Sequence, residues 1–404
     1  MHILIVTENS YSGGLDSFIL NLISFWPHDE DTFTIIVNSS HPGVERLLQL
    51  PRTKVRIIQH HLPLLWSIQQ RSSHRFLMKL ASVCSVLKRP FLHYIYLHYF
   101  RKAFSLLRPD RLLVINGGYP GGWTCRAATN AWPAYGSIHH SVHNFHNYVA
   151  PMRWWEVPME QILDRRLSYS CSHLVTVSAS CLKSIQHRPL LRSRARTSFI
   201  HNGIPIPNLH SKTAKNTLRS DFCPPTSTHL CLMLGTYEAR KGHIYLLRAF
   251  KKVLDRLPDA HLLICGYGYP ADVEKVATLV SSMDLTSSVT LKGFQTDVST
   301  ILSLSDLLIV PSIVDESFGL MVLDAMSHQL PVIASNTGGI PEILTGPLSE
   351  LLIDPYDTQL FADKIVNSLE NKSFSSDLTQ YAYQHFLKAF TADISSRKYS
   401  QLFR

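Results

Sequence analysis

The chain has no hydrophobic run that approaches the roughly 18 residues needed to cross a bilayer. Its 404 residues contain only seven cysteines, an odd number scattered without a Cys-x-x-Cys pair. This pattern argues against a disulfide framework and a cysteine-based zinc site, and we interpret the cysteines as reduced cytosolic thiols. The first residues, MHILIVTENS, lack a basic region and predict a buried strand followed by a turn rather than a signal peptide.

Short apolar runs alternate with amphipathic stretches along the whole chain. They are HILIVT, TFTIIVN, KVRIIQ, RLLVIN, AYGSIHH and HLVTVS in the first half, and LCLMLG, HLLICG, SVTLKG, DLLIVPS, LPVIAS and LLIDP in the second. Near-continuous apolar strands separated by helices predict parallel sheets covered on both faces. Because the chain is too long for one ordinary core, we predict an α/β protein with two doubly wound domains and a cleft between them.

The domain boundary is predicted near HNGIPIPNLHSKTAKN, which is rich in Pro, Asn and Lys. We place the first domain at 1–203 and the second at 204–380. The stretch 381–404 has helical spacing of aromatic and apolar residues, so it either packs back on the first domain or caps the second.

Two strand-to-helix turns could hold a ligand, because ligands of parallel sheets bind at the carboxyl ends of the strands. Gly13 and Gly14 follow the first strand and would let a phosphate approach the backbone, although an ordinary turn uses the same pair. Arg240 and Lys241 precede a helix, where cations oppose the helix dipole. They are easier to explain if an anion lies beside them, but a solvated basic turn is the alternative.

The stretch DESFGLMVLDAM places two carboxylates around one turn. We predict a helix from Ser317 to Met326 with Glu316 at or just before its N-terminus and the amides of Phe318, Gly319 and Leu320 pointing out of the first turn. Asp324 would then lie roughly 12 Å further along the helix axis. This is too far for the carboxylate pair of a glycosidase, which needs about 5–9.5 Å, but suits an extended ligand. A helix cap with an exposed aspartate remains the alternative.

The following run, SHQLPVIASNTGGIPEIL, opens another buried strand into a pair of glycines and a helix start. Together with ARKGH and FIHNGIP upstream, this part of the chain resembles the retaining nucleotide-sugar glycosyltransferases of family 4. The resemblance is strong over residues 200–345 and weak elsewhere. It implies the GT-B fold, in which two Rossmann-like domains face each other across a cleft.

The resemblance also implies roles for the residues that bind the donor. Glu316 matches the first carboxylate of the family's Glu-x7-Glu pair, near the transferred sugar. Asp324 stands where the family has the second glutamate, which binds the nucleotide ribose. Lys241 matches the lysine that neutralises the donor diphosphate. The family's usual arginine is replaced by Thr236, and Arg240 is expected to supply that positive charge instead.

Two further assignments concern the first domain. Gly13 and Gly14 resemble the loop that closes over the diphosphate. In SIHHSVHN, we assign His143 to the family histidine near the reacting sugar, with His140 as the rival and a purely structural role as a third possibility.

These assignments predict a sugar transferase that moves a hexose-type unit from a nucleotide diphosphate to a glycan or lipid-linked glycan. Arg240 and Lys241 can stabilise the leaving diphosphate, so we expect no metal and no other cofactor. A sugar-nucleotide epimerase and a non-catalytic partner with the same fold remain alternatives. An NAD-dependent dehydrogenase is not expected, since SYSGGLDSF does not supply Gly-x-Gly-x-x-Gly.

Charge is unevenly distributed between the halves. Residues 1–200 hold 22 Lys and Arg against 10 Asp and Glu, and the stretch 71–111 holds nine against one. This aromatic-rich stretch could lie on the anionic inner surface of the membrane and reach a lipid-linked acceptor. Alternatively, it is a pair of helices with solvated basic faces. Nucleic acid is not expected as a partner, because no binding motif accompanies the charge.

Overall fold

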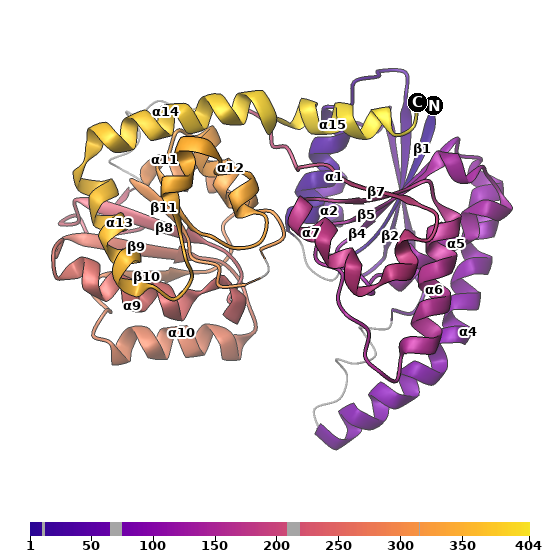
Figure 1. Ribbon diagram of the computed structural model, residues 1–404, viewed down its shortest axis with the longest axis horizontal. Coiled ribbons are helices and arrows are strands. Elements are labelled where there is room, and N and C mark those ends of the chain that lie inside the picture. The colour runs from indigo at the N-terminus through magenta and orange to yellow at the C-terminus, as the bar shows by residue number, and fades with distance from the viewer. Residues whose placement is uncertain (10–12, 65–74, 208–218, 315) are drawn as a thin grey trace. The chain divides into compact units, whose positions relative to one another are not determined.

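The computed structural model describes residues 1–9, 13–64, 75–207, 219–314 and 316–404, without the side chains of 75–88 and 372–375. It divides into two units (Figure 1). The first unit is Met1–Asn202 together with Ala392–Arg404, and the second is Gly203–Thr391. None of the helices in this described part of the chain is long and apolar enough to span a membrane.

The first unit is built on a seven-stranded sheet in the order β3-β2-β1-β4-β5-β6-β7, in which all neighbouring strands are parallel. Its strands are β1 (His2–Glu8), β2 (Thr32–Asn38), β3 (Val55–His60), β4 (Arg111–Asn116), β5 (Ser141–Phe145), β6 (His173–Thr176) and β7 (Arg196–Phe199). Such a sheet confirms the predicted α/β architecture.

Helices cover both faces of this sheet. They are α1 (Gly14–Ser24), α2 (Val44–Leu47), α4 (Arg75–Leu107), α5 (Trp123–Ala131), α6 (Val157–Ser170), α7 (Ala179–Ser184) and α15 (Ala392–Gln401). Alternate residues of each strand point to opposite faces. Ile3 and Ile5 of β1 therefore pack in the core that includes α1 and Tyr399 of α15, whereas Leu4 and Val6 pack in the core that includes α4 and α5.

The second unit contains a six-stranded parallel sheet in the order β10-β9-β8-β11-β12-β13. Its strands are β8 (His229–Leu234), β9 (Ala260–Cys265), β10 (Val289–Lys292), β11 (Leu307–Val310), β12 (Val332–Ser335) and β13 (Leu352–Ile353). Its helices are α9 (His243–Leu254), α10 (Pro270–Ser282), α11 (Val298–Leu304), α12 (Leu320–Ser327), α13 (Thr358–Glu370) and α14 (Lys372–Ala389).

The C-terminal part of the chain is divided between the units. Helix α14 belongs to the second unit and α15 to the first, so the boundary lies at Thr391 rather than at residue 380. The first unit holds α15 and the residues after it through polar contacts. Asn144 Nδ2 donates to Tyr399 Oη at 2.7 Å, and Arg111 Nε donates to the carbonyl of Phe403 at 3.0 Å.

One predicted strand is displaced. The run AYGSIHH does not form a strand, because Ile138–His140 is a short 3-10 helix whose first amides are capped by Ser137, with Oγ accepting from His139 N. The strand is the next five residues, β5, which lies between β4 and β6. Apolar content alone could not separate these two adjacent segments.

Candidate functional site

The turn after β8 and the loop after β11 meet in the second unit, because β8 and β11 are neighbouring parallel strands. Gly242 adopts a left-handed backbone conformation with φ of 77°, and a Cβ at this position would lie 1.9 Å from the carbonyl oxygen of Pro311. The amide of Ile313 also donates to the carbonyl of Arg240 at 2.8 Å. These backbone contacts bring the residues before α9 next to those that follow β11.

Lys241 and Glu316 form a close, largely buried ion pair in this place. Lys241 Nζ lies 2.6 Å from Glu316 Oε2, and Ser312 Oγ donates to the same oxygen at 2.8 Å. Arg240 Nη1 lies 3.9 Å from it. Burial alone would raise the pKa of Glu316, but Lys241, Arg240 and Ser312 lower it below its ordinary value. Glu316 is therefore ionised.

A second carboxylate, which the sequence analysis did not identify, holds Arg240. Arg240 Nε donates to Glu238 Oε2 at 2.6 Å, and Thr236 Oγ1 donates to Glu238 Oε1 at 2.7 Å. Thr236 thus stands in the place of the expected arginine and contacts Arg240 through Glu238. Neither Glu238 nor Ser312 could have been recognised from spacing, because each acts through a tertiary contact.

The helix after Glu316 begins later than predicted. Gly319 has a φ of 103°, outside the helical region, and α12 starts at Leu320. Glu316 consequently lies before the helix rather than at its cap, and the predicted 12 Å axial separation from Asp324 does not apply. The carbonyl of Glu316 accepts from Gly339 N at 2.8 Å. The Phe318 side chain is buried near Phe390, with ring centroids 6.1 Å apart.

Asp324 is half-buried on α12. Burial raises the pKa of its carboxyl group to about 7. Its side chain has no ion-pair or hydrogen-bond partner among the residues that the structure describes. A hydroxyl group that entered and donated to this carboxyl would favour its ionised form.

Replacing Asp324 by asparagine is expected to raise the free energy of unfolding at pH 8 by about 1–2 kcal/mol. The folded-state pKa lies above the ordinary value of an unfolded aspartate, so ionisation costs the folded protein stability as the pH rises from about 4 to about 7. Below pH 4 the two proteins should be equally stable. Urea denaturation at both pH values measures the difference. The exposed Asp377→Asn serves as control, and an equal gain at both pH values would contradict this account.

Gly13 and Gly14 belong to the first unit, where they form the start of α1. The amide of Gly13 donates to Asp16 Oδ2 at 3.0 Å, and the other Asp16 oxygen lies 2.8 Å from His41 Nε2. Arg46 Nη1 donates to the carbonyl of Gly13 at 3.4 Å. The backbone of this turn is thus braced by a buried acid–histidine pair, and the residues just before it, 10–12, lie outside the described part.

Three histidines lie along β5 at different depths. His140 precedes the strand, at the amino end of the sheet, and His143 lies inside it with no exposed surface, where Nδ1 bonds Thr129 Oγ1 at 2.7 Å. Burial and nearby Arg126 lower the pKa of His143 to about 3. His146 directly follows the strand, at the carboxyl end where ligands bind, and its ring lies against Phe18. The sequence did not indicate His146, because the predicted strand was placed several residues too early.

The described residues contain no group of three or more His, Cys, Asp or Glu side chains that could hold a metal ion. The sequence has one Asp-x-Asp, Asp29-Glu30-Asp31. It lies before β2, at the amino end of the sheet, where Asp31 pairs with the N-terminal amine at 2.6 Å and accepts from Trp26 Nε1 at 2.8 Å. These contacts give Asp31 a structural role.

The sequence is similar to known proteins over the second unit and beyond it. Residues 215–385 match the family Glycosyl transferases group 1. D-inositol 3-phosphate glycosyltransferase of Corynebacterium jeikeium is 29% identical over 44% of this chain and 44% of the relative. N-acetyl-alpha-D-glucosaminyl L-malate synthase of Bacillus anthracis is 24% identical over 59% of this chain and 61% of the relative. The chain thus matches about half the length of these curated relatives.

Solved structures resemble the chain over nearly its whole length. A glycosyltransferase from Rickettsia africae has a TM-score of 0.76 at 18% identity, covering 100% of this chain and 97% of the other. Anabaena HepE in complex with UDP and glucose has a TM-score of 0.74 at 16% identity, covering 99% and 98%. At such identities the likeness shows the fold. Residues 215–385 of the second unit thus match the glycosyl transferases group 1, and the two units have the GT-B fold.

Proposed function

We propose that this protein is a retaining glycosyltransferase that moves a sugar from a nucleotide-diphosphate sugar to a glycan or lipid-linked glycan, without a metal ion. The observation that carries the proposal is the cluster of Arg240, Lys241 and Glu316 at the carboxyl end of β8 and β11. It offers two cations beside a buried carboxylate within the family domain. A nucleotide-sugar donor is supported by the Anabaena HepE structure in complex with UDP-glucose.

The proposed reaction asks mainly for stabilisation of negative charge. The acceptor hydroxyl attacks the anomeric carbon while the bond from that carbon to the diphosphate oxygen breaks. The electron pair stays on the diphosphate, which also takes the proton of the acceptor. Arg240 and Lys241 stabilise the departing diphosphate, and preorganised charges of this kind are usually the largest catalytic contribution. Glu316 lies beside the transferred sugar, and Asp324 accepts the hydroxyl groups of the nucleotide ribose.

The first unit contributes Gly13 and Gly14 near the diphosphate and a histidine near the transferred sugar. We assign this histidine to His146 in place of His143, because only His146 follows the strand and is partly exposed. The basic segment 71–111 is the proposed contact with an anionic membrane surface at the cytoplasmic side. Its side chains are described from Arg89 onward, and Phe91, Tyr94 and Arg101 among them are exposed.

Incubation of the purified protein with a panel of nucleotide sugars tests the proposal. We expect a nucleotide-dependent rise in melting temperature and slow hydrolysis of one donor, both unchanged by EDTA because the arginine and lysine replace the metal. His146→Ala should lower donor hydrolysis, whereas His143→Ala, at a position with no exposed surface, should mainly lower the melting temperature.

The outcomes separate the alternatives. Loss of hydrolysis in EDTA would contradict metal independence. Binding of a nucleotide sugar without hydrolysis or transfer to any acceptor would favour a non-catalytic partner. Asp324 and Thr236, which differ from the residues of the family, are the reason for this alternative. Conversion of one nucleotide sugar into its epimer would favour an epimerase.

A further inference from the structure

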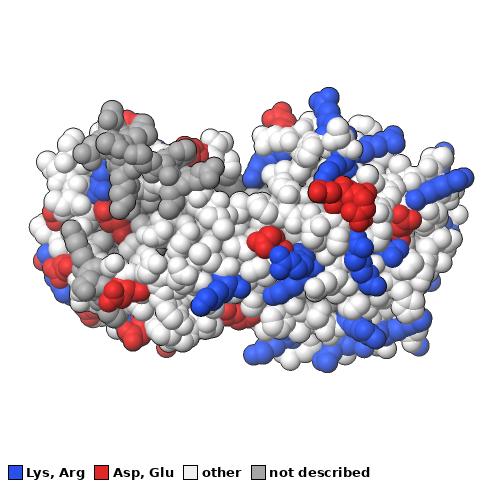
Figure 2. All heavy atoms as spheres, turned by 90° about the horizontal axis from the view of Figure 1, so that it is seen from above, with Lys and Arg blue, Asp and Glu red and all other residues white. Residues whose placement is uncertain are grey.

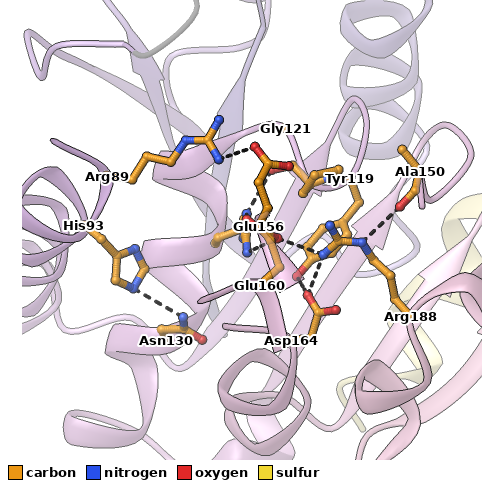
Figure 3. A network of polar contacts seen from close by, with 12 residues as sticks. Arg89, His93, Tyr119, Gly121, Asn130, Ala150, Glu156, Glu160, Asp164 and Arg188 are labelled. Carbon is orange, nitrogen blue, oxygen red and sulfur yellow. Dashed lines mark hydrogen bonds and ion pairs between the residues drawn. The ribbon is translucent and has the colours of Figure 1, made fainter. Parts of the chain in front are cut away.

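Helix α6 turns its acidic side chains toward the interior of the first unit. Glu156 precedes the helix, and Glu160 and Asp164 follow at four-residue intervals on the same side. All three are buried. Figure 3 shows Glu156, Glu160 and Asp164 together with their arginine partners Arg89 and Arg188.

Three buried or nearly buried arginines neutralise these acids. Arg89 Nη1 lies 2.6 Å from Glu156 Oε1, and Arg126 forms a bidentate pair with Glu160 at 3.2 and 2.9 Å. Arg188 Nη1 lies 2.8 Å from both Glu160 Oε2 and Asp164 Oδ1 (Figure 3). Three positive and three negative side chains thus balance inside the protein, and none of these acids is available at the surface.

The opposite side of α6 is cationic and aromatic. We define the α6 face as Trp154, Trp155, Ile162, Arg165, Arg166 and Tyr169. All six residues are exposed, with 82% of Trp154, 51% of Trp155, 56% of Ile162 and 42% of Tyr169 accessible. Within the helix these positions recur at three- and four-residue intervals, so they share one side.

Further cations border the α6 face. The Arg153 guanidinium lies 5.7 Å from the ring centre of Trp155, and those of Arg165 and Arg194 lie 5.8 and 5.5 Å from that of Tyr169. Ser168 Oγ of α6 accepts from the amide of Arg194 at 2.9 Å, which keeps this arginine beside the last turn of the helix. Aromatic rings and guanidinium groups are therefore interleaved along the whole length of the face.

No acidic residue close in sequence compensates these cations. The sequence has no Asp or Glu from 111 to 155 or from 165 to 220, so the acids of residues 111–220 are the three inside the network. The exposed Lys183, Arg192 and Arg196 add to the same excess. Figure 2, which views the molecule from above, shows Lys and Arg spread widely over the first unit, at the right, with a few Asp and Glu between them.

We propose that the α6 face binds the surface of an anionic membrane. Tryptophan side chains prefer the boundary between water and lipid, where the ring is buried and the N–H stays hydrated. Arginines beside them are attracted by anionic headgroups, while their stems cover apolar surface. A nucleic acid or anionic glycan would satisfy the arginines and could stack on Trp154, but it gives no reason for the exposed Ile162. No residue of the α6 face belongs to the segment 71–111, although Arg89 of that segment pairs with Glu156, the residue after the second tryptophan of the face. The inference does not depend on the proposed enzymatic activity.

Co-sedimentation with vesicles tests the inference. We expect the full-length protein to bind phosphatidylcholine vesicles that contain about one third phosphatidylglycerol, and to bind pure phosphatidylcholine vesicles at least tenfold more weakly. Arg165→Ala/Arg166→Ala should weaken binding to the anionic vesicles about tenfold or more. Trp154→Ser/Trp155→Ser should weaken it similarly at high salt, where the apolar contribution dominates. Because all four positions are exposed, the variants should keep the melting temperature of the parent.

The matched control removes two exposed arginines elsewhere in the first unit, Arg52→Ala/Arg56→Ala, and should bind like the parent protein. If this control loses as much vesicle binding as Arg165→Ala/Arg166→Ala, the effect reflects only the net charge of the protein, and the proposal that the α6 face binds the membrane is wrong. The proposal is also wrong if the tryptophan variant binds the anionic vesicles fully and the protein binds heparin tightly. That result would identify a soluble polyanion as the partner. Loss only in Arg101→Ala/Lys102→Ala would place the membrane contact on segment 71–111 instead.

Discussion

Replacement of Lys241 by alanine is expected to lower the rate of sugar transfer at least about 100-fold. Lys241 Nζ is 2.6 Å from Glu316 and is the cation closest to it, since Arg240 lies at 3.9 Å and is also held by Glu238. Without Lys241, Glu316 remains buried beside a single, more distant cation. The pKa of Glu316 should then rise, and the developing charge on the leaving diphosphate loses its main partner. Single-turnover rates with the best donor of the panel measure the effect.

Two comparisons separate catalysis from folding. Lys275→Ala removes an exposed lysine of the same unit and should leave transfer unchanged. Glu316→Gln keeps the shape of the side chain and removes its charge, so it should also lower transfer about 100-fold while the protein stays folded. Near-normal transfer in both Lys241→Ala and Glu316→Gln would remove this pair from the proposed site, even if the protein proves to be a glycosyltransferase.

Replacement of Glu160 by alanine should destabilise the first unit by about 3–5 kcal/mol. The glutamate accepts from Arg126 and Arg188, and both guanidinium groups are fully buried. Arg126 also lies over the rings of Tyr119 and Trp123, at 5.0 and 4.6 Å, so it cannot move to solvent without breaking these contacts. Removal of the carboxylate leaves two positive charges inside the protein with only Asp164 to balance them. Urea denaturation at pH 7 measures the loss.

The matched control is an exposed ion pair in the same unit. Lys54 and Asp29 are 2.6 Å apart but largely solvated, so Lys54→Ala should change the stability little. Glu160→Gln, which can still accept hydrogen bonds, should fall between Lys54→Ala and Glu160→Ala. If Glu160→Ala is no worse than Lys54→Ala, the buried network does not stabilise the first unit as described.

The sequence predicted most strands of the two sheets because most of them are short apolar runs with buried residues on both faces. The exception is β7, a polar and partly exposed run that was not predicted. HILIVT became β1, whose alternate side chains pack in two different cores, and DLLIVPS became β11, whose four residues are all buried. The error at β5 has a local cause. AYGSIHH and SVHNF are adjacent and similarly apolar, and the cap that Ser137 gives to His139 N decides which of them is helical.

The candidate site was predicted in part. Arg240, Lys241 and Glu316 were identified from the turns that carry them, and the structure brings these three side chains together. The start of α12 was placed too early because the conformation of Gly319 depends on the loop around it. Glu238 and Ser312 were missed because their roles depend on tertiary contacts, with Arg240 and Glu316 respectively.

The sequence by itself determined the α/β class, the two parallel sheets and the positions of the strand-to-helix turns, since periodicity and turn residues act over a few neighbouring positions. Tertiary structure decided which turns meet, which histidine ends β5, and where the acids of α6 point. Those outcomes depend on contacts between residues such as Lys241 and Glu316, or Arg188 and Glu160, that are 75 and 28 positions apart. Only the order of strands in each sheet brings such residues within bonding distance.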